Sequence, residues 1–97
     1  MPEKDVSHRL EGNLDVFSYE GREIVITPQP RDQDSLPMVY NFQSHNASDK
    51  YEGRVLVNPL KSGERVVDDL PTRLRAAKAA FNEVHDQIRQ SLYKREA

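Results

Sequence analysis

Histidine and carboxylate side chains are the groups in this 97-residue chain that could bind a metal ion or transfer protons. The histidines are His8, His45 and His85, and none has a second histidine at the i, i+4 spacing that places two ligands on one helix face. The chain has no cysteine, which removes thiolate ligands, thiol nucleophiles and disulfides together. The sequence therefore predicts no metal site and no bound cofactor.

The adjacent acids Asp68 and Asp69 could in principle perform general acid-base chemistry. They stand directly before an apolar periodic segment, however, and carboxylates in that position usually cap a helix. No serine occupies a GxSxG turn, and the four glycines are too far apart in the sequence to form a phosphate-binding loop. We expect no catalytic residues and no enzymatic activity.

A basic cluster suggests a different chemistry, which is contact with the phosphate groups of a nucleic acid. Three of its members, Arg73, Arg75 and Lys78, fall in the first turns of the predicted helix, and Arg65 lies close upstream. The competing explanation is an ordinary solvated helix face, and the formal net charge of −2 gives no general attraction to nucleic acid. A nucleic-acid-binding module is therefore kept as the alternative function.

The tetrapeptide YEGR occurs twice, from Tyr19 to Arg22 and from Tyr51 to Arg54, and each copy leads into an apolar stretch. The interpretation we favour is that both copies are a glycine turn or bulge that feeds a strand. A second interpretation places the two tyrosines and two arginines at similar tips, where they would contact a partner protein. Ancestral duplication is the third.

The strands and the helix that position these residues are predicted from the periodicity of apolar residues. Glycine and proline punctuate the first two thirds of the chain, and the segments between them alternate as strands do. The predicted strands are residues 14–19, 22–27, 38–43, 50–57 and 65–67, with the first two joined at Glu20-Gly21. A helix over about residues 70–94 is predicted by apolar residues recurring at steps of four and three. Those residues are Leu70, Leu74, Ala77, Phe81, Val84, Ile88 and Leu92.

These elements predict an α+β fold, in which a small antiparallel sheet of three to five strands carries one long amphipathic C-terminal helix on one face. We expect one domain over residues 14–97, with the sheet in 14–67. Residues 1–13 are polar, with little to bury, and are predicted to form a flexible arm.

The predicted helix is too long for its sheet, because ~39 Å of helix would lie over strands of only ~17–23 Å. The apolar end of the helix should then need another cover. The residues concerned are Ile88, Leu92 and Tyr93. A second copy of the chain is the simplest cover, the N-terminal arm through Val6 and Leu10 is another, and a frayed helix end would need none.

Taken together, these observations predict a small non-catalytic accessory or regulatory protein that binds another protein or, as a homodimer, a second copy of itself. Its protein-binding residues are expected to be Tyr19, Arg22, Tyr51, Arg54, Ile88, Leu92 and Tyr93. We expect no membrane partner and a cytoplasmic location, because the sequence contains no apolar segment of signal-peptide or bilayer-spanning length.

Overall fold

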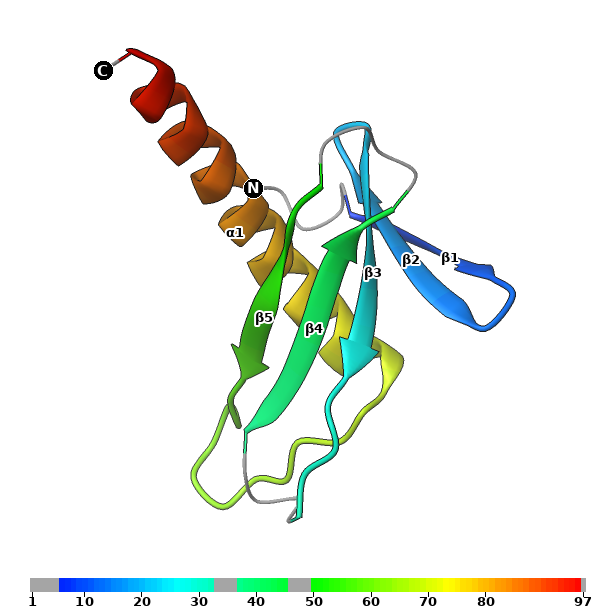
Figure 1. Ribbon diagram of the computed structural model, residues 1–97. Coiled ribbons are helices and arrows are strands. Elements are labelled where there is room, and N and C mark those ends of the chain that lie inside the picture. Colours follow the sequence, from blue (N-terminus) through cyan, green and yellow to red (C-terminus); the bar gives the residue numbers. More distant parts are fainter. Residues whose placement is uncertain (1–5, 33–36, 46–49, 97) are drawn as a thin grey trace.

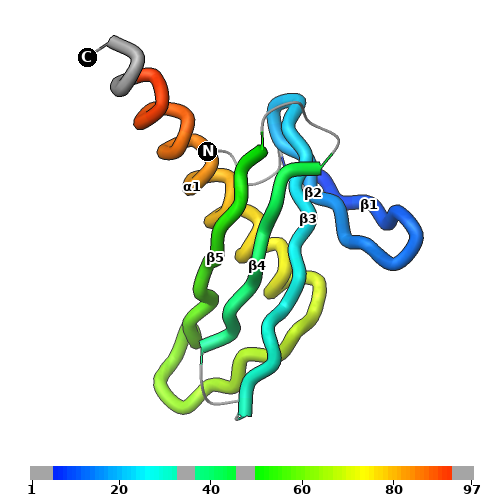
Figure 2. The backbone as a smooth tube through the Cα atoms, viewed as in Figure 1, coloured from blue at the N-terminus to red at the C-terminus, as the bar shows by residue number. Residues whose placement is uncertain are grey.

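The computed structural model describes residues 6–32, 37–45 and 50–96, except the side chains of residues 93–96. Within these residues, five antiparallel strands form one sheet and a long helix packs on one of its faces (Figures 1 and 2). The elements are β1 (Ser7–Glu11), β2 (Leu14–Tyr19), β3 (Arg22–Pro28), β4 (Met38–Ser44), β5 (Glu52–Val57) and α1 (Leu70–Glu96). This arrangement confirms the predicted α+β fold.

The strands are hydrogen-bonded in the order in which they occur in the chain, so β1 and β5 form the two edges of the sheet. The turn between β2 and β3 consists of Glu20 and Gly21, whose φ angles are 50° and 79°. Two consecutive positive φ angles are typical of the type I′ turn that suits the right-handed twist of a two-residue hairpin. The predicted turn at Glu20-Gly21 is confirmed.

Strand β1 lies within the segment for which the sequence predicts a flexible arm. Its register pairs His8 with Phe17 and Arg9 with Val16, and the rings of His8 and Phe17 lie 4.8 Å apart. The side chains that hold β1 against β2 are mostly polar. The strand therefore lacks the apolar alternation from which strands are predicted. Residues 1–5 of the predicted arm lie outside the described residues.

The fifth strand predicted at 65–67 is not formed, and that prediction is wrong. Val66 is buried, but its backbone carbonyl accepts a hydrogen bond from the Arg31 guanidinium rather than from a neighbouring strand. This segment belongs to the connection that leads from β5 to α1.

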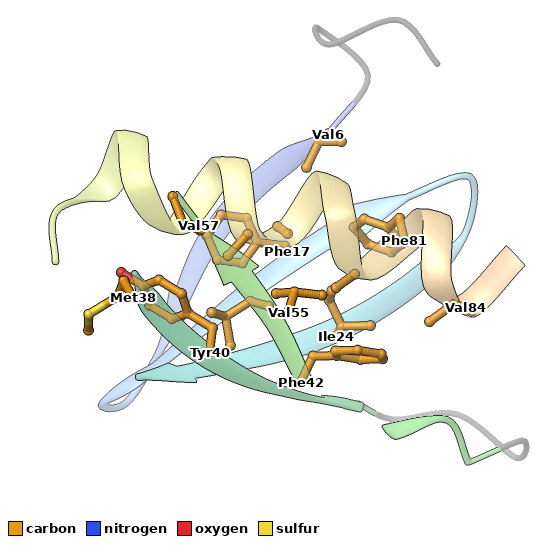
Figure 3. Packing of buried hydrophobic residues seen from close by; sticks show 14 of the residues in the cluster. Val6, Phe17, Ile24, Met38, Tyr40, Phe42, Val55, Val57, Phe81 and Val84 are labelled. Carbon is orange, nitrogen blue, oxygen red and sulfur yellow. The ribbon is translucent and has the colours of Figure 1, made fainter. Parts of the chain in front are cut away.

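The hydrophobic core lies between α1 and one face of the sheet (Figure 3). The sheet contributes alternate residues of each strand, and the helix contributes one stripe. The larger members are Phe17, Ile24, Ile26, Met38, Tyr40, Phe42, Val55, Val57, Phe81 and Val84. The N-terminal segment adds Val6, whereas Leu10 is exposed.

Two buried valines lie on the other face, which α1 does not cover. Val16 and Val25 are directly paired, and their relative exposures are 0% and 5%. On the same face, the Glu11 carboxylate of β1 lies 3.3 Å from His45, just after β4, although two strands separate β1 from β4. The sheet must therefore curl strongly toward this face, which is how the valines are covered.

Asp69 caps the start of α1, as the sequence predicts for one of the two acids. Its Oδ1 accepts a hydrogen bond from the Thr72 backbone N–H at 2.9 Å. Hydrogen bonds from the Thr72 side chain and from this N–H hold the pKa of the carboxyl below its usual range. Asp68 has another role: it accepts hydrogen bonds from the Tyr40 hydroxyl at 2.7 Å and from Arg73. Burial, together with that carboxylate, raises the pKa of Tyr40.

Candidate protein-binding edge

Strand β5 is hydrogen-bonded to β4 on one side and forms an edge of the sheet on the other. The Ser44 N–H donates to the Tyr51 carbonyl at 2.8 Å. This bond shows which residues of β5 are hydrogen-bonded to β4. In an antiparallel pair, alternate residues bond to the neighbour. The backbone groups of Gly53, Val55 and Val57 therefore point toward β4, and those of Arg54 and Leu56 point outward.

The two ends of this edge are covered by side chains of α1. Gln87 donates from Nε2 to the Glu52 carbonyl at 3.2 Å, and Arg75 donates from a guanidinium nitrogen to the Asn58 carbonyl at 2.9 Å. Between them, the outward N–H and C=O groups of Arg54 and Leu56 have no partner within residues 6–32, 37–45 and 50–96. These four groups form a short, open segment of strand edge.

Helix α1 extends past this edge. Figure 1 shows it crossing behind β5 and continuing beyond the strand. Its 27 residues span ~40 Å, whereas a seven-residue strand spans ~23 Å. Leu92 lies on the same helical stripe as Val84 and Ile88, yet 53% of its surface is exposed.

The other two residues expected at the helix end behave differently. Ile88 is partly buried and packs against the core, so the prediction that it projects past the sheet is wrong. The reason is that Ile88 follows the core residue Val84 by one helical turn and lies on the same core-facing stripe. The side chain of Tyr93 lies outside the described part of the chain.

The residues of the YEGR copies do not form a common surface. Tyr19 packs against Phe81, with 5.6 Å between ring centroids, and Tyr51 is also partly buried against the core. Arg22 pairs with Tyr19 and so points to the side of the sheet that carries α1, whereas Arg54 pairs with Asn41 on the helix-free side. The two arginines face opposite sides of the sheet.

Most of the predicted basic cluster interacts with other parts of the chain. Arg73 contacts the carboxylates of both Asp15 and Asp68, and Asp15 also accepts a hydrogen bond from His8 Nε2 at 2.8 Å. Arg75 bonds to the Asn58 carbonyl. Lys78, too, has an interaction partner, and Arg65 is exposed in the connection before α1. The cluster therefore anchors the start of α1 to the sheet.

A charged cluster on the helix-free face has no signature in the sequence. Arg9 donates hydrogen bonds to the carboxylates of Glu11 and Glu23, and His45 lies 3.3 Å from Glu11. The bonds from Arg9 hold the pKa values of both carboxyls below their usual range. Only the fold brings these residues together, because 34 positions separate Glu11 from His45.

The ligand atoms of Glu11, Glu23 and His45 all lie within 4.8 Å of one another, a spacing at which a divalent cation could bridge them. The guanidinium of Arg9 already balances the two negative charges. We therefore interpret this cluster as a set of ion pairs that covers Val16 and Val25.

Among the described residues, no helix is long and apolar enough to cross a membrane. Comparison of the chain with protein-family models, with curated proteins and with solved structures gave no match.

Proposed function

We propose that this chain is a small, non-catalytic accessory or regulatory protein that binds another protein by accepting an extended segment along the open edge of β5. The observation that carries the proposal is the set of unpartnered backbone groups at Arg54 and Leu56. Strand addition at a sheet edge is a recurring mode of peptide recognition, in which such groups supply affinity.

The residues flanking this edge also favour a short added strand. Gln87 and Arg75 occupy the Glu52 and Asn58 carbonyls, which limits continuous pairing to the centre of β5. Proteins usually block long open edges because these promote aggregation. A centre left open between two blocked ends is consistent with selective binding rather than with unrestricted pairing.

Helix α1 provides a surface against which the added strand can pack. Side chains of that strand that point to the helix side of the sheet would lie beside the part of α1 between Arg75 and Gln87, which contact the two ends of β5. Apolar side chains there would pack next to the core and be removed from water, at ~25 cal/mol per Å².

A second copy of the chain is a less suitable source of the strand. Pairing β5 with another β5 would bring a second α1 beneath the junction, into the region that the first α1 already crosses. Paired strands lie ~4.8 Å apart, whereas packed helices need ~8–10 Å between their axes. We therefore favour a partner whose strand has no helix beneath it, in the cytoplasm, which a cysteine-free chain suits.

The test is to pan a displayed library of random peptides against the intact chain and to measure amide hydrogen exchange with the enriched peptides bound. We expect slower exchange at Arg54 and Leu56 in the complex. Leu56→Pro removes an outward N–H and should weaken binding about tenfold or more while the fold is kept. Val55→Pro is the matched control, because it removes a bond to β4 and should destabilise the sheet itself.

Three outcomes would overturn the proposal. One is a library that yields no enriched peptide, and another is a bound peptide that leaves the exchange of Arg54 and Leu56 unchanged. The third is concentration-dependent dimerisation, measured by light scattering, that protects these same two amides in the chain alone, since this would assign the edge to a second copy.

A further inference from the structure

The open edge carries two charges whose partners are missing within the described part of the chain. Glu52 and Arg54 are two positions apart on β5, so both side chains point to the helix-free side of the sheet. Both are exposed, and neither side chain makes an ion pair or a hydrogen bond with a described residue. By contrast, Arg9, Glu11 and Glu23 on that side are bonded to one another.

We propose that the partner segment carries an acidic residue opposite Arg54 and a basic residue two positions away, opposite Glu52, with apolar residues at the alternate positions. This inference rests on the strand addition proposed above. Directly opposed residues of neighbouring strands point to the same face. All neighbouring strands of this sheet are antiparallel, and an added antiparallel strand would place its acidic residue opposite Arg54 before its basic residue opposite Glu52. Like charges at either position would repel.

A hollow in the helix-free face gives these side chains room. It has a volume of about 600 Å³, within the range of ligand-binding pockets. Buried Val25 lies at its floor, and Glu52 and Arg54 line it together with the polar side chains of Asn41 and Gln43. Long acidic and basic side chains of the partner can therefore reach the two charges of β5 over the strand edge.

The helix side of the edge explains the alternate apolar positions. Partner residues opposite Gly53 and Val55 point toward α1, because Gly53 and Val55 belong to the helix-facing set of β5. The part of α1 beside these positions lies between Arg75 and Gln87, which contact the Asn58 and Glu52 carbonyls, and it includes Ala79, which packs against the core. Charged partner residues would lose hydration on this side of the sheet, whereas apolar residues would extend the core.

The experiment compares the native chain with a charge-swapped variant that combines Glu52→Arg and Arg54→Glu. Both proteins are panned against the same library of random ten-residue peptides. The native chain should select peptides that read acidic, apolar, basic from the N-terminus, and the variant should select peptides that read basic, apolar, acidic. Peptides selected on the native chain should bind the variant about fivefold to tenfold more weakly, with a difference that shrinks at high salt.

The outcomes separate this inference from the proposed function. The inference is overturned if both proteins select the same charge order, even where hydrogen exchange still shows protection at Arg54 and Leu56; strand addition would then stand. If those amides are unprotected in every complex, strand addition itself is refuted. Equal thermal midpoints of the two proteins provide the folding control, because both substituted side chains are exposed.

Discussion

The two copies of YEGR have different structures. In Tyr19–Arg22 the chain reverses, and Gly21 has a φ of 79°. In Tyr51–Arg54 the chain continues straight into β5, and Gly53 has no positive φ. The interpretation that both glycines form turns or bulges is right for the first copy and wrong for the second.

Gly53 is required for a different reason, which is the ring of Phe42 on the opposing strand. A Cβ atom at position 53 would lie 2.9 Å from two carbons of that ring, closer than real Cβ contacts. A Cβ at Gly21 would meet nothing within 4 Å. A glycine beside a strand can thus be needed for a positive φ, as at Gly21, or for the space of a missing side chain, as at Gly53. The residues on the neighbouring strand determine which of the two applies.

The largest expected effect is the loss of stability caused by Phe81→Ala. Its coupling to Tyr19 and to Tyr51 compares how the two copies are anchored. Phe81→Ala should lower the free energy of unfolding by about 3–5 kcal/mol, because it empties a buried site in the core. The ring of Phe81 lies against Tyr19. In double-mutant cycles measured by urea unfolding, Phe81 should therefore couple to Tyr19 by ~0.5–1.5 kcal/mol and only weakly to Tyr51. Equal coupling to both tyrosines would show that the copies are anchored alike.

An intermediate effect is expected from matched substitutions of the two glycines. Gly53→Ala should destabilise the protein by ~1–3 kcal/mol, because the buried Phe42 ring must move. Gly21→Ala should cost ~1–2 kcal/mol through its left-handed backbone. Asparagine separates the two causes, since it tolerates a positive φ but adds volume. Gly21→Asn should be close to neutral, and Gly53→Asn should be worse than Gly53→Ala.

The sequence was sufficient for the elements that have a strong period or a strong turn signal. The helix stripe through Ala77, Phe81 and Val84 and the Glu20-Gly21 hairpin were both predicted and are both present. Strand β1 was missed because polar contacts hold it, although the Gly12-Asn13 pair between Glu11 and Leu14 is a hairpin signal that could have revealed it.

The candidate site could be predicted only in part. Arg54 was named, but its importance depends on which backbone groups of β5 point outward, and the hydrogen bond between Ser44 and Tyr51 sets that phase. Leu56 was not named, because an alternating strand pattern does not show which strand lies at the edge. The cluster around Arg9 depends on the curl of the sheet, which brings residues of β1 and β3 together with His45 just after β4.

The smallest expected effect is on the pH dependence of stability. It arises from the residue that follows each copy, which is the acid Glu23 after the first and the apolar Val55 after the second. Hydrogen bonds from Arg9 lower the pKa values of Glu23 and Glu11 from an ordinary value of 4.5. A carboxyl with a lowered pKa in the folded state binds protons first in the unfolded state as the pH falls. Its contribution to stability is therefore complete above about pH 4.5 and is lost as the pH falls through the folded pKa.

We accordingly expect the thermal midpoint to fall as the pH drops from about 4.5 to about 3, with Asp69 contributing in the same direction through its hydrogen bonds with Thr72. Glu23→Gln should make this fall shallower, because one of the linked carboxyls is gone. Glu52→Gln, in the second copy, is the matched control and should leave the slope unchanged, since Glu52 has no ion pair with a described residue. Identical slopes for the two variants would mean that the Arg9 contacts do not hold the curled sheet in solution.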